Sequence, residues 1–107
     1  MESPRFERVC RTANSEGYLI VDGEDEEVVG RVDLHFTSGP VYGVLVIERD
    51  LPESDILELR REIDDEIVQT ADVPRDDFLL AVYRGQPVRT EPFTDEDDLQ
   101  PITDALP

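Results

Sequence analysis

The sequence predicts a single α+β domain, in which a mostly antiparallel sheet of four to five strands carries one amphipathic helix on one face. Three observations support this fold class. The chain of 107 residues is long enough for one compact domain and too short for two. Several short segments alternate apolar and polar residues with the period of a strand, and one longer segment has the apolar spacing of a helix. We expect the order β-β-β-β-α-β in a compact domain at residues 1–85.

Two strands of unequal strength are expected near the N-terminus. Phe6–Thr12 alternates only raggedly, so the sequence leaves open whether it joins the sheet. Tyr18–Asp22 is a short strand that leads into an acidic loop at residues 23–27. This loop would close a hairpin with the strand that follows.

The clearest strand is Val28–Thr37, whose apolar residues alternate with largely polar ones, so one of its faces should be buried. After the turn residues 38–40, Val41–Glu48 is apolar on both faces and reads as a central strand. Gly30 and Gly43 lie on facing strands of this hairpin. They are expected to mark a bulge or a close approach of the helix.

A helix is predicted after residue 50. Asp50-Leu51-Pro52-Glu53 has the form of a capping box with proline in the first turn. The segment should end at Val73-Pro74, because proline cannot continue a helix. The apolar stripe consists of Ile56, Leu59, Ile63 and Ile67, widened by Leu57, Val68 and Ala71.

The last predicted strand, Phe78–Arg84, is apolar on both faces and is therefore expected inside the sheet. A right-handed crossover through the helix should place it parallel or nearly adjacent to Val41–Glu48. One helix covers only one face of a sheet, so an apolar face remains uncovered, and such a face usually marks an interface. The sequence therefore predicts a homo-oligomer or a protein partner bound through Tyr42, Val44, Val46, Leu79 and Tyr83.

Residues 86–107 are predicted to form an acidic, proline-containing disordered tail. A second interpretation is that its mixture of acidic and apolar residues forms a linear motif that folds onto a partner. The apolar residues concerned are Phe93, Leu99, Ile102 and Leu106.

Charge is the strongest compositional feature. The chain has 27 Asp and Glu against 10 Arg and no Lys, a net charge of −17. Direct nucleic-acid binding and attachment to anionic membranes are disfavoured, because both need a basic surface. A GC-rich genome, adaptation to high salt or both would explain the composition. The alternatives are a cationic partner and imitation of a polyanion, and we expect cations to bind only non-specifically.

The sequence indicates a cytoplasmic protein. It contains no apolar run of membrane-spanning length and no basic start followed by a hydrophobic run, as a signal peptide would have. The lone Cys10 agrees with a reducing compartment.

Few residues suggest chemistry. His35, the only histidine, is expected beside Asp33 on the outward face of a strand, and Asp76-Asp77 lie at the helix-to-strand junction. These four residues are the candidates for a small enzyme or a metal site. No nucleophile motif and no glycine-rich phosphate loop is present, so we predict no catalytic residue and no cofactor. Arg5, Arg8 and Arg11 are expected to pair with surface carboxylates.

The functional hypothesis is therefore a non-catalytic acidic interaction domain that binds itself or another protein through an apolar sheet face. Two alternatives remain open. One is a polyanion mimic that occupies the basic surface of a partner, and the other is a small enzyme or metal-binding protein that uses His35 and nearby carboxylates.

Overall fold

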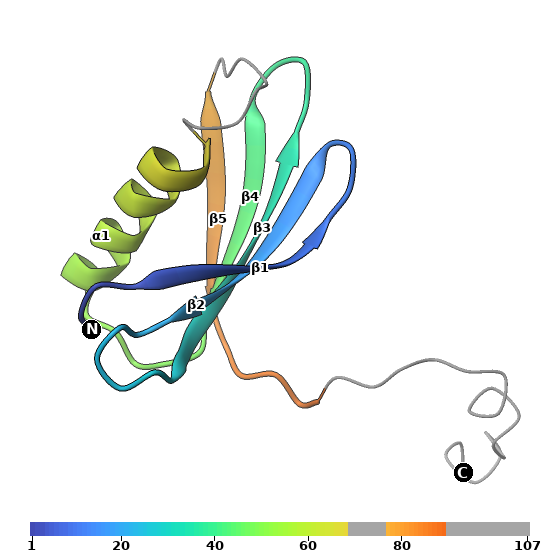
Figure 1. The fold of residues 1–107 in the computed structure, drawn as a ribbon. Helices are drawn as coiled ribbons and strands as arrows, with labels where there is room; N and C mark the ends of the chain where they lie inside the picture. Colours follow the sequence, from blue (N-terminus) through green and yellow to red (C-terminus); the bar gives the residue numbers. More distant parts are fainter. Residues whose placement is uncertain (69–76, 90–107) are drawn as a thin grey trace, which may run out of the picture.

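The computed structural model describes residues 1–68 and 77–89 of the chain. The described elements follow the predicted β-β-β-β-α-β order, and the fold class is confirmed (Figure 1). Predictions for Ala71, Val73-Pro74, Asp76 and residues 90–107 lie outside these residues. The elements are β1 (Arg5–Arg11), β2 (Ser15–Val21), β3 (Val28–Phe36), β4 (Val41–Ile47), helix α1 (Glu53–Ile63), a π-helical turn at Asp64–Val68, and β5 (Phe78–Arg84).

The sheet has the strand order β1-β2-β3-β4-β5. Its first four strands form an antiparallel meander, and β5 pairs with β4 in parallel. The strand predicted with least support, Phe6–Thr12, joins the sheet as β1. The parallel pairing of β5 with β4 confirms the expected adjacency across the helical crossover.

The expectation that Phe78–Arg84 lies inside the sheet is wrong, because β5 is an edge strand in the described sheet. Its apolar residues have unequal surroundings. Phe78 is buried in the core, whereas Leu79, Val82 and Tyr83 are exposed. Two apolar faces therefore do not give this strand a neighbour on each side.

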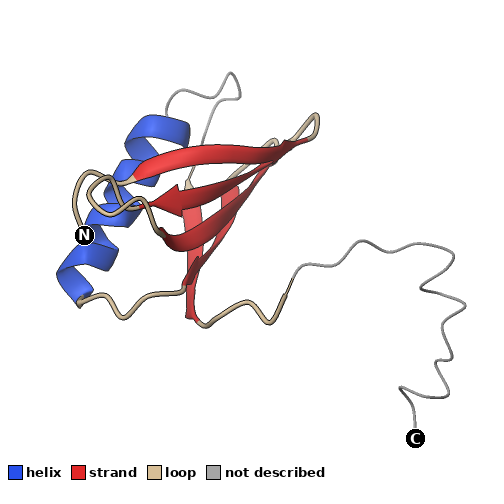
Figure 2. Ribbon diagram, turned by 60° about the horizontal axis from the view of Figure 1, so that its bottom comes forward, coloured by secondary structure: helices blue, strands red, loops and turns tan. Residues whose placement is uncertain are grey.

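Helix α1 packs across one face of the sheet and buries the core between them (Figure 2). Leu59 and Ile63 are fully buried, and Ile67 and Val68 of the π-helical turn continue the buried stripe. Leu57 was expected to widen this stripe but is exposed. The core contains Ile20, Val29, Val32, Leu34, Phe36, Val41, Leu45, Ile47, Leu51, Leu59, Ile63, Ile67, Val68 and Phe78.

The predicted capping box is also wrong. Pro52, which has no polar side chain, occupies the N-cap position of α1. Asp50 instead accepts a hydrogen bond from Arg84 at 3.2 Å. Arg84 also donates to the carbonyl of Leu51 at 3.3 Å, so it fastens the end of β5 to the chain that enters the helix.

A β-bulge alters the predicted faces of β3. The register with β2 shifts between Ile20, which pairs with Gly30, and Val21, which pairs with Val28. Val29 is the additional residue and is fully buried, whereas Val28 is exposed. The bulge expected at Gly30 lies directly beside it, at Val29, and the close neighbour of Gly30 is the backbone of β4 rather than the helix. The same expectation for Gly43 is wrong, because its register is regular and its closest neighbours are side chains of Leu80, Leu34 and Phe78.

Glu62 on α1 is expected to reduce stability at neutral pH. Within the described residues, its Oε2 atom is buried without a hydrogen-bond partner. Burial, followed by the nearby carboxylates of Glu66 and Glu58, raises the pKa of Glu62. A carboxyl whose pKa is raised by folding stabilises the fold when protonated. Its contribution is fully present below the unfolded pKa of about 4.3 and is lost as the pH rises through the folded pKa.

We therefore expect Glu62→Gln to raise the midpoint of thermal unfolding at about pH 7 and to change it little near pH 3, where Glu62 is protonated. The matched control is Glu24→Gln, which removes one charge from an exposed loop residue and should raise the midpoint at neutral pH only by the smaller amount due to reduced charge repulsion. Circular dichroism melts at both pH values measure the effect. A variant no more stable than the control at neutral pH would contradict it.

Candidate functional site

The predicted interface residues lie side by side on the sheet face opposite α1. The β4–β5 register places Tyr42 beside Leu79, Val44 beside Ala81 and Val46 beside Tyr83. The β4 residues that alternate with them, Gly43, Leu45 and Ile47, are buried on the helix side. We call the six residues on the open face the outer patch: Tyr42, Val44, Val46, Leu79, Ala81 and Tyr83.

The outer patch is exposed along most of its length. Tyr42, Val44, Leu79 and Tyr83 are between 37% and 59% exposed, and Val46 is half-buried. Large apolar side chains seldom gather in this way without a partner. The patch also reaches β5, the edge of the described sheet, where backbone groups can pair with another strand.

Apolar exposure continues around this edge to the helix side. Val82 pairs with the buried Leu45 and so points to the covered face, yet 45% of it is exposed. The helix thus covers the β5 border at Phe78 but leaves it uncovered at Val82. An occupant placed beside β5 could bury side chains of both faces.

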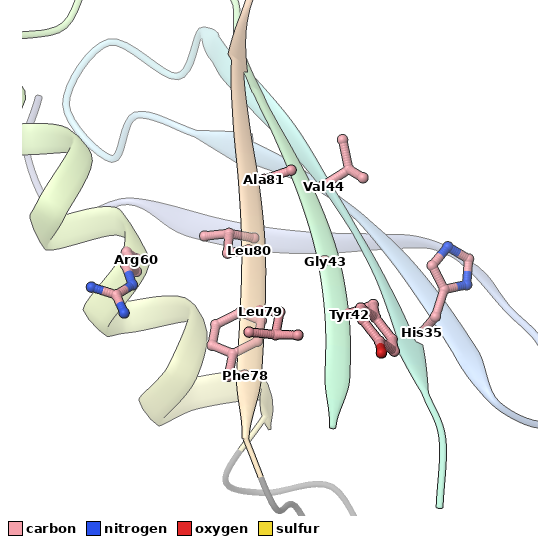
Figure 3. Close-up of a pocket in the computed structure, with 9 residues that line it drawn as sticks. All are labelled: His35, Tyr42, Gly43, Val44, Arg60, Phe78, Leu79, Leu80 and Ala81. Carbon is pink, nitrogen blue, oxygen red and sulfur yellow. The ribbon is translucent and has the colours of Figure 1, made fainter. Parts of the chain in front are cut away.

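A hollow of about 630 Å³ follows the same border (Figure 3). Tyr42, Val44 and Leu79 contribute from the open face, whereas Phe78, Leu80 and Arg60 contribute from the helix side. A strand placed next to β5 would send alternate side chains to these two sides. The remaining lining residues are His35, Gly43 and Ala81.

Sequence reasoning missed two parts of this site. Ala81 completes the middle row of the outer patch, but a small residue gives no hydrophobic signal. Val82 belongs by its alternation to the buried face. Its exposure depends on where the helix stops covering the sheet, which no local pattern encodes.

Asp33 and His35 lie on the open face of β3, as predicted from alternation, and next to the outer patch. Asp33 pairs with Val44 and His35 with Tyr42 in the β3–β4 register. The Asp33 carboxylate accepts hydrogen bonds from Arg31 at 3.0 and 3.1 Å. This interaction raises the pKa of Arg31. Asp33 is thus engaged in an ion pair.

Asp77 makes a local contact at the start of β5. Its carboxylate accepts a hydrogen bond from the backbone N–H of Phe78 at 2.8 Å, at the start of β5. Asp76 lies outside the described residues. Across residues 1–68 and 77–89, no group of three or more His, Cys, Asp or Glu side chains is placed to hold a metal ion.

The acidic loop between β2 and β3 is held by arginines. Arg49 donates a 2.7 Å hydrogen bond to the buried Asp22 and also pairs with Asp25 at 3.2 Å. Hydrogen bonds from the backbone N–H groups of Glu24 and Glu2, together with Arg49, lower the pKa of Asp22. The carboxylates of Asp22 and Asp25 are therefore already paired with an arginine of the same chain.

The arginines near the N-terminus also pair with carboxylates. Arg5 binds Glu7 at 2.7 Å and Glu26 at 3.0 Å, and Arg11 binds Glu16 at 3.6 Å. The predicted pairing is confirmed for these two residues. Their strand β1 therefore presents a charged edge to solvent.

No family model, curated protein or solved structure matches the chain. In the part of the chain that the structure describes, no helix is long and apolar enough to cross a membrane. The open border at β5, with the outer patch beside it, is accordingly the candidate functional site on geometric grounds alone.

Proposed function

We propose that the protein is a non-catalytic interaction domain that associates with a second copy of itself along the edge strand β5, including the outer-patch residues that β5 carries, Leu79, Ala81 and Tyr83. The observation that carries this proposal is an edge strand with exposed apolar side chains on both of its faces. Leu79 and Tyr83 are exposed on the open face, and Val82 is exposed on the helix side. A partner lying flat on the open face would leave Val82 in water, so the proposed contact runs along the edge.

The two edges of the described sheet differ in how they are protected. Strand β1 carries charged residues along its length and a register shift between Arg8 and Cys10, and both features discourage strand pairing. Strand β5 pairs regularly with β4 from Phe78 to Arg84. Of the two edges of the sheet formed by residues 1–68 and 77–89, β5 is therefore the one suited to strand pairing. A contact between two copies of one edge closes as a dimer instead of growing into a fibre.

Charge favours the same location. Two copies with a net charge of −17 repel each other, so a contact between them needs a surface without acid. The segment Phe78–Arg84 contains no acidic residue, and its single charge, on Arg84, pairs with Asp50. Salt screens the remaining repulsion, so association should strengthen as salt is added.

Sedimentation of two single-substitution variants tests the proposal. Leu79→Glu places a charge in the contact, whereas Val9→Glu places the same charge on the opposite edge strand at matched exposure, 46% against 48%. At about 100 μM protein and about 2 M NaCl, we expect a dimer for the wild type and for Val9→Glu. Leu79→Glu should weaken association by at least about 30-fold, the effect of losing a hot-spot residue.

A wild-type monomer under these conditions would overturn the proposal, and so would equal weakening by both variants. Circular dichroism of each variant establishes that it is folded. Because both positions are exposed, neither charge enters the core.

A further inference from the structure

We infer that the two copies join by antiparallel pairing of β5 with β5, with Ala81 on the two-fold axis. This inference rests on the proposed self-association and specifies its geometry. The result is one continuous sheet, with the outer patches side by side on one face and the two α1 helices on the other.

The backbone of β5 determines which residues can pair. The carbonyl of Asp77 accepts from the Val41 N–H at 2.7 Å, and the Gly85 N–H donates to the Ile47 carbonyl at 2.9 Å. In a parallel pair, alternate residues bond to the neighbouring strand, so the odd-numbered residues of β5 face β4. The N–H and C=O groups of Leu80 and Val82 consequently face the open edge of the described sheet.

Only certain registers use these groups fully. In an antiparallel pair, two residues that both face the partner exchange a pair of hydrogen bonds. When Leu80 pairs with Val82 of the second copy, such a pair of hydrogen bonds forms on each side of the axis. Ala81 then lies opposite Ala81 of the second copy. With the axis at residue 80 or 82, the hydrogen-bonded pairs are no longer centred on the strand. One end of β5 then extends beyond the contact.

The side chains fit this register as well. Leu79 lies opposite Tyr83 of the second copy on the open face, and Leu80 lies opposite Val82 on the helix side. Each exposed apolar residue of β5 thereby gains an apolar neighbour, and such cross-strand pairs stabilise sheets. Arg84 falls opposite Phe78, which keeps the two guanidinium groups at opposite ends of the contact.

The small side chain of Ala81 suits the axis. Residues opposite each other without mutual hydrogen bonds have Cα atoms about 4.5 Å apart, the closest approach in an antiparallel pair. That separation lies within the range of about 4.4–6.8 Å that a disulfide spans. A cysteine at position 81 should therefore cross-link to its symmetry mate.

Single-cysteine variants test the register. In a Cys10→Ser background, Ala81→Cys should form a disulfide-linked dimer under mild oxidation. Leu79→Cys should not, because in this register the two copies of residue 79 lie roughly 14 Å apart, four residues along the strand direction. Non-reducing electrophoresis measures cross-linking, and sedimentation of the reduced proteins measures association independently.

The outcomes separate the inference from the proposed function. Cross-linking at position 81 but not at 79 supports the inferred register. Preferential cross-linking of Leu80→Cys or Val82→Cys overturns it while self-association stands. A dimer that no β5 cysteine cross-links overturns edge pairing, and a monomer overturns both the register and the proposed function.

Discussion

Lowering the salt concentration is expected to destabilise this protein strongly. We expect the midpoint of thermal unfolding to rise by on the order of 20 °C between about 0.1 M and about 2 M NaCl. At roughly 4–8 °C per kcal/mol for a domain of this size, this corresponds to about 3–5 kcal/mol. The cause is the net charge of −17, whose self-repulsion acts against the compact state. The screening length falls from about 10 Å at 0.1 M to about 3 Å at 1 M.

Screening also weakens the ion pairs, but this opposing effect is smaller. The contacts of Arg5 and Arg49 with the acidic loop are at least partly solvent-exposed, and an exposed pair typically contributes about 0–1 kcal/mol. The chain has 10 basic residues for 27 acidic ones, so most carboxylates have no arginine to balance them. Repulsion among these excess carboxylates therefore determines the sign of the salt effect.

Circular dichroism melts across the salt series measure this effect. The control is a triple variant, Glu2→Gln, Glu24→Gln and Asp65→Asn, which neutralises three exposed side chains. Its unfolding midpoint should be higher at low salt and should depend less steeply on salt. If the wild type is folded and indifferent to salt, adaptation to salt does not explain the carboxylates. A cationic partner or imitation of a polyanion would then become the leading explanation of the charge.

Strand β5 shows which parts of the fold are encoded locally. Its continuous run of apolar residues predicts the bounds Phe78–Arg84, which the structure reproduces. Its place in the sheet could not be predicted in the same way, because an apolar strand has the same pattern inside a sheet and at an edge. Which of the two it becomes depends on whether the rest of the chain supplies another strand.

Long-range contacts account for the other differences. Asp50 has the local pattern of a helix cap, but Arg84, far along the chain, binds its carboxylate. The bulge at Gly30 shifts Val29 into the core against the simple alternation of β3. In both cases, the decisive partner lies on an element that local periodicity does not include.

The candidate site was predictable to the extent that it follows from alternation. One helix can cover only one face, so the outward residues of β4 and β5 could be named from the sequence. The pairing Tyr42–Leu79 and Val46–Tyr83 required the parallel register, which the order of elements suggested. The open edge and the exposure of Val82 required the assembled sheet.

Gly30→Ala is expected to destabilise the protein by about 3 kcal/mol or more, at the upper end of the effects of overpacking. Gly30 is buried in β3 opposite Ile47. A Cβ atom at this position would overlap the carbonyl oxygen of Val46. That oxygen belongs to the backbone of β4, which pairs with β3 on one side and β5 on the other, so it cannot move without disturbing the sheet. A methyl group there thus forces the central strands apart.

Two other glycines provide controls of graded severity. At Gly43, an added Cβ would meet the ends of the Leu80 and Leu34 side chains at 2.8 and 2.9 Å, and these can rotate away at a smaller cost than a backbone shift. At Gly85, nothing lies within 4 Å, so alanine should be tolerated or stabilise by about 0.4–1 kcal/mol by restricting the unfolded chain.

Urea unfolding in about 2 M NaCl ranks the three variants, with the salt present so that charge repulsion does not mask the steric effect. The expected order of stability is Gly85→Ala, then Gly43→Ala, then Gly30→Ala. Equal stability of the Gly30 and Gly85 variants would mean that β3 and β4 separate at little cost. The close approach of the β4 backbone would then not explain why position 30 is glycine.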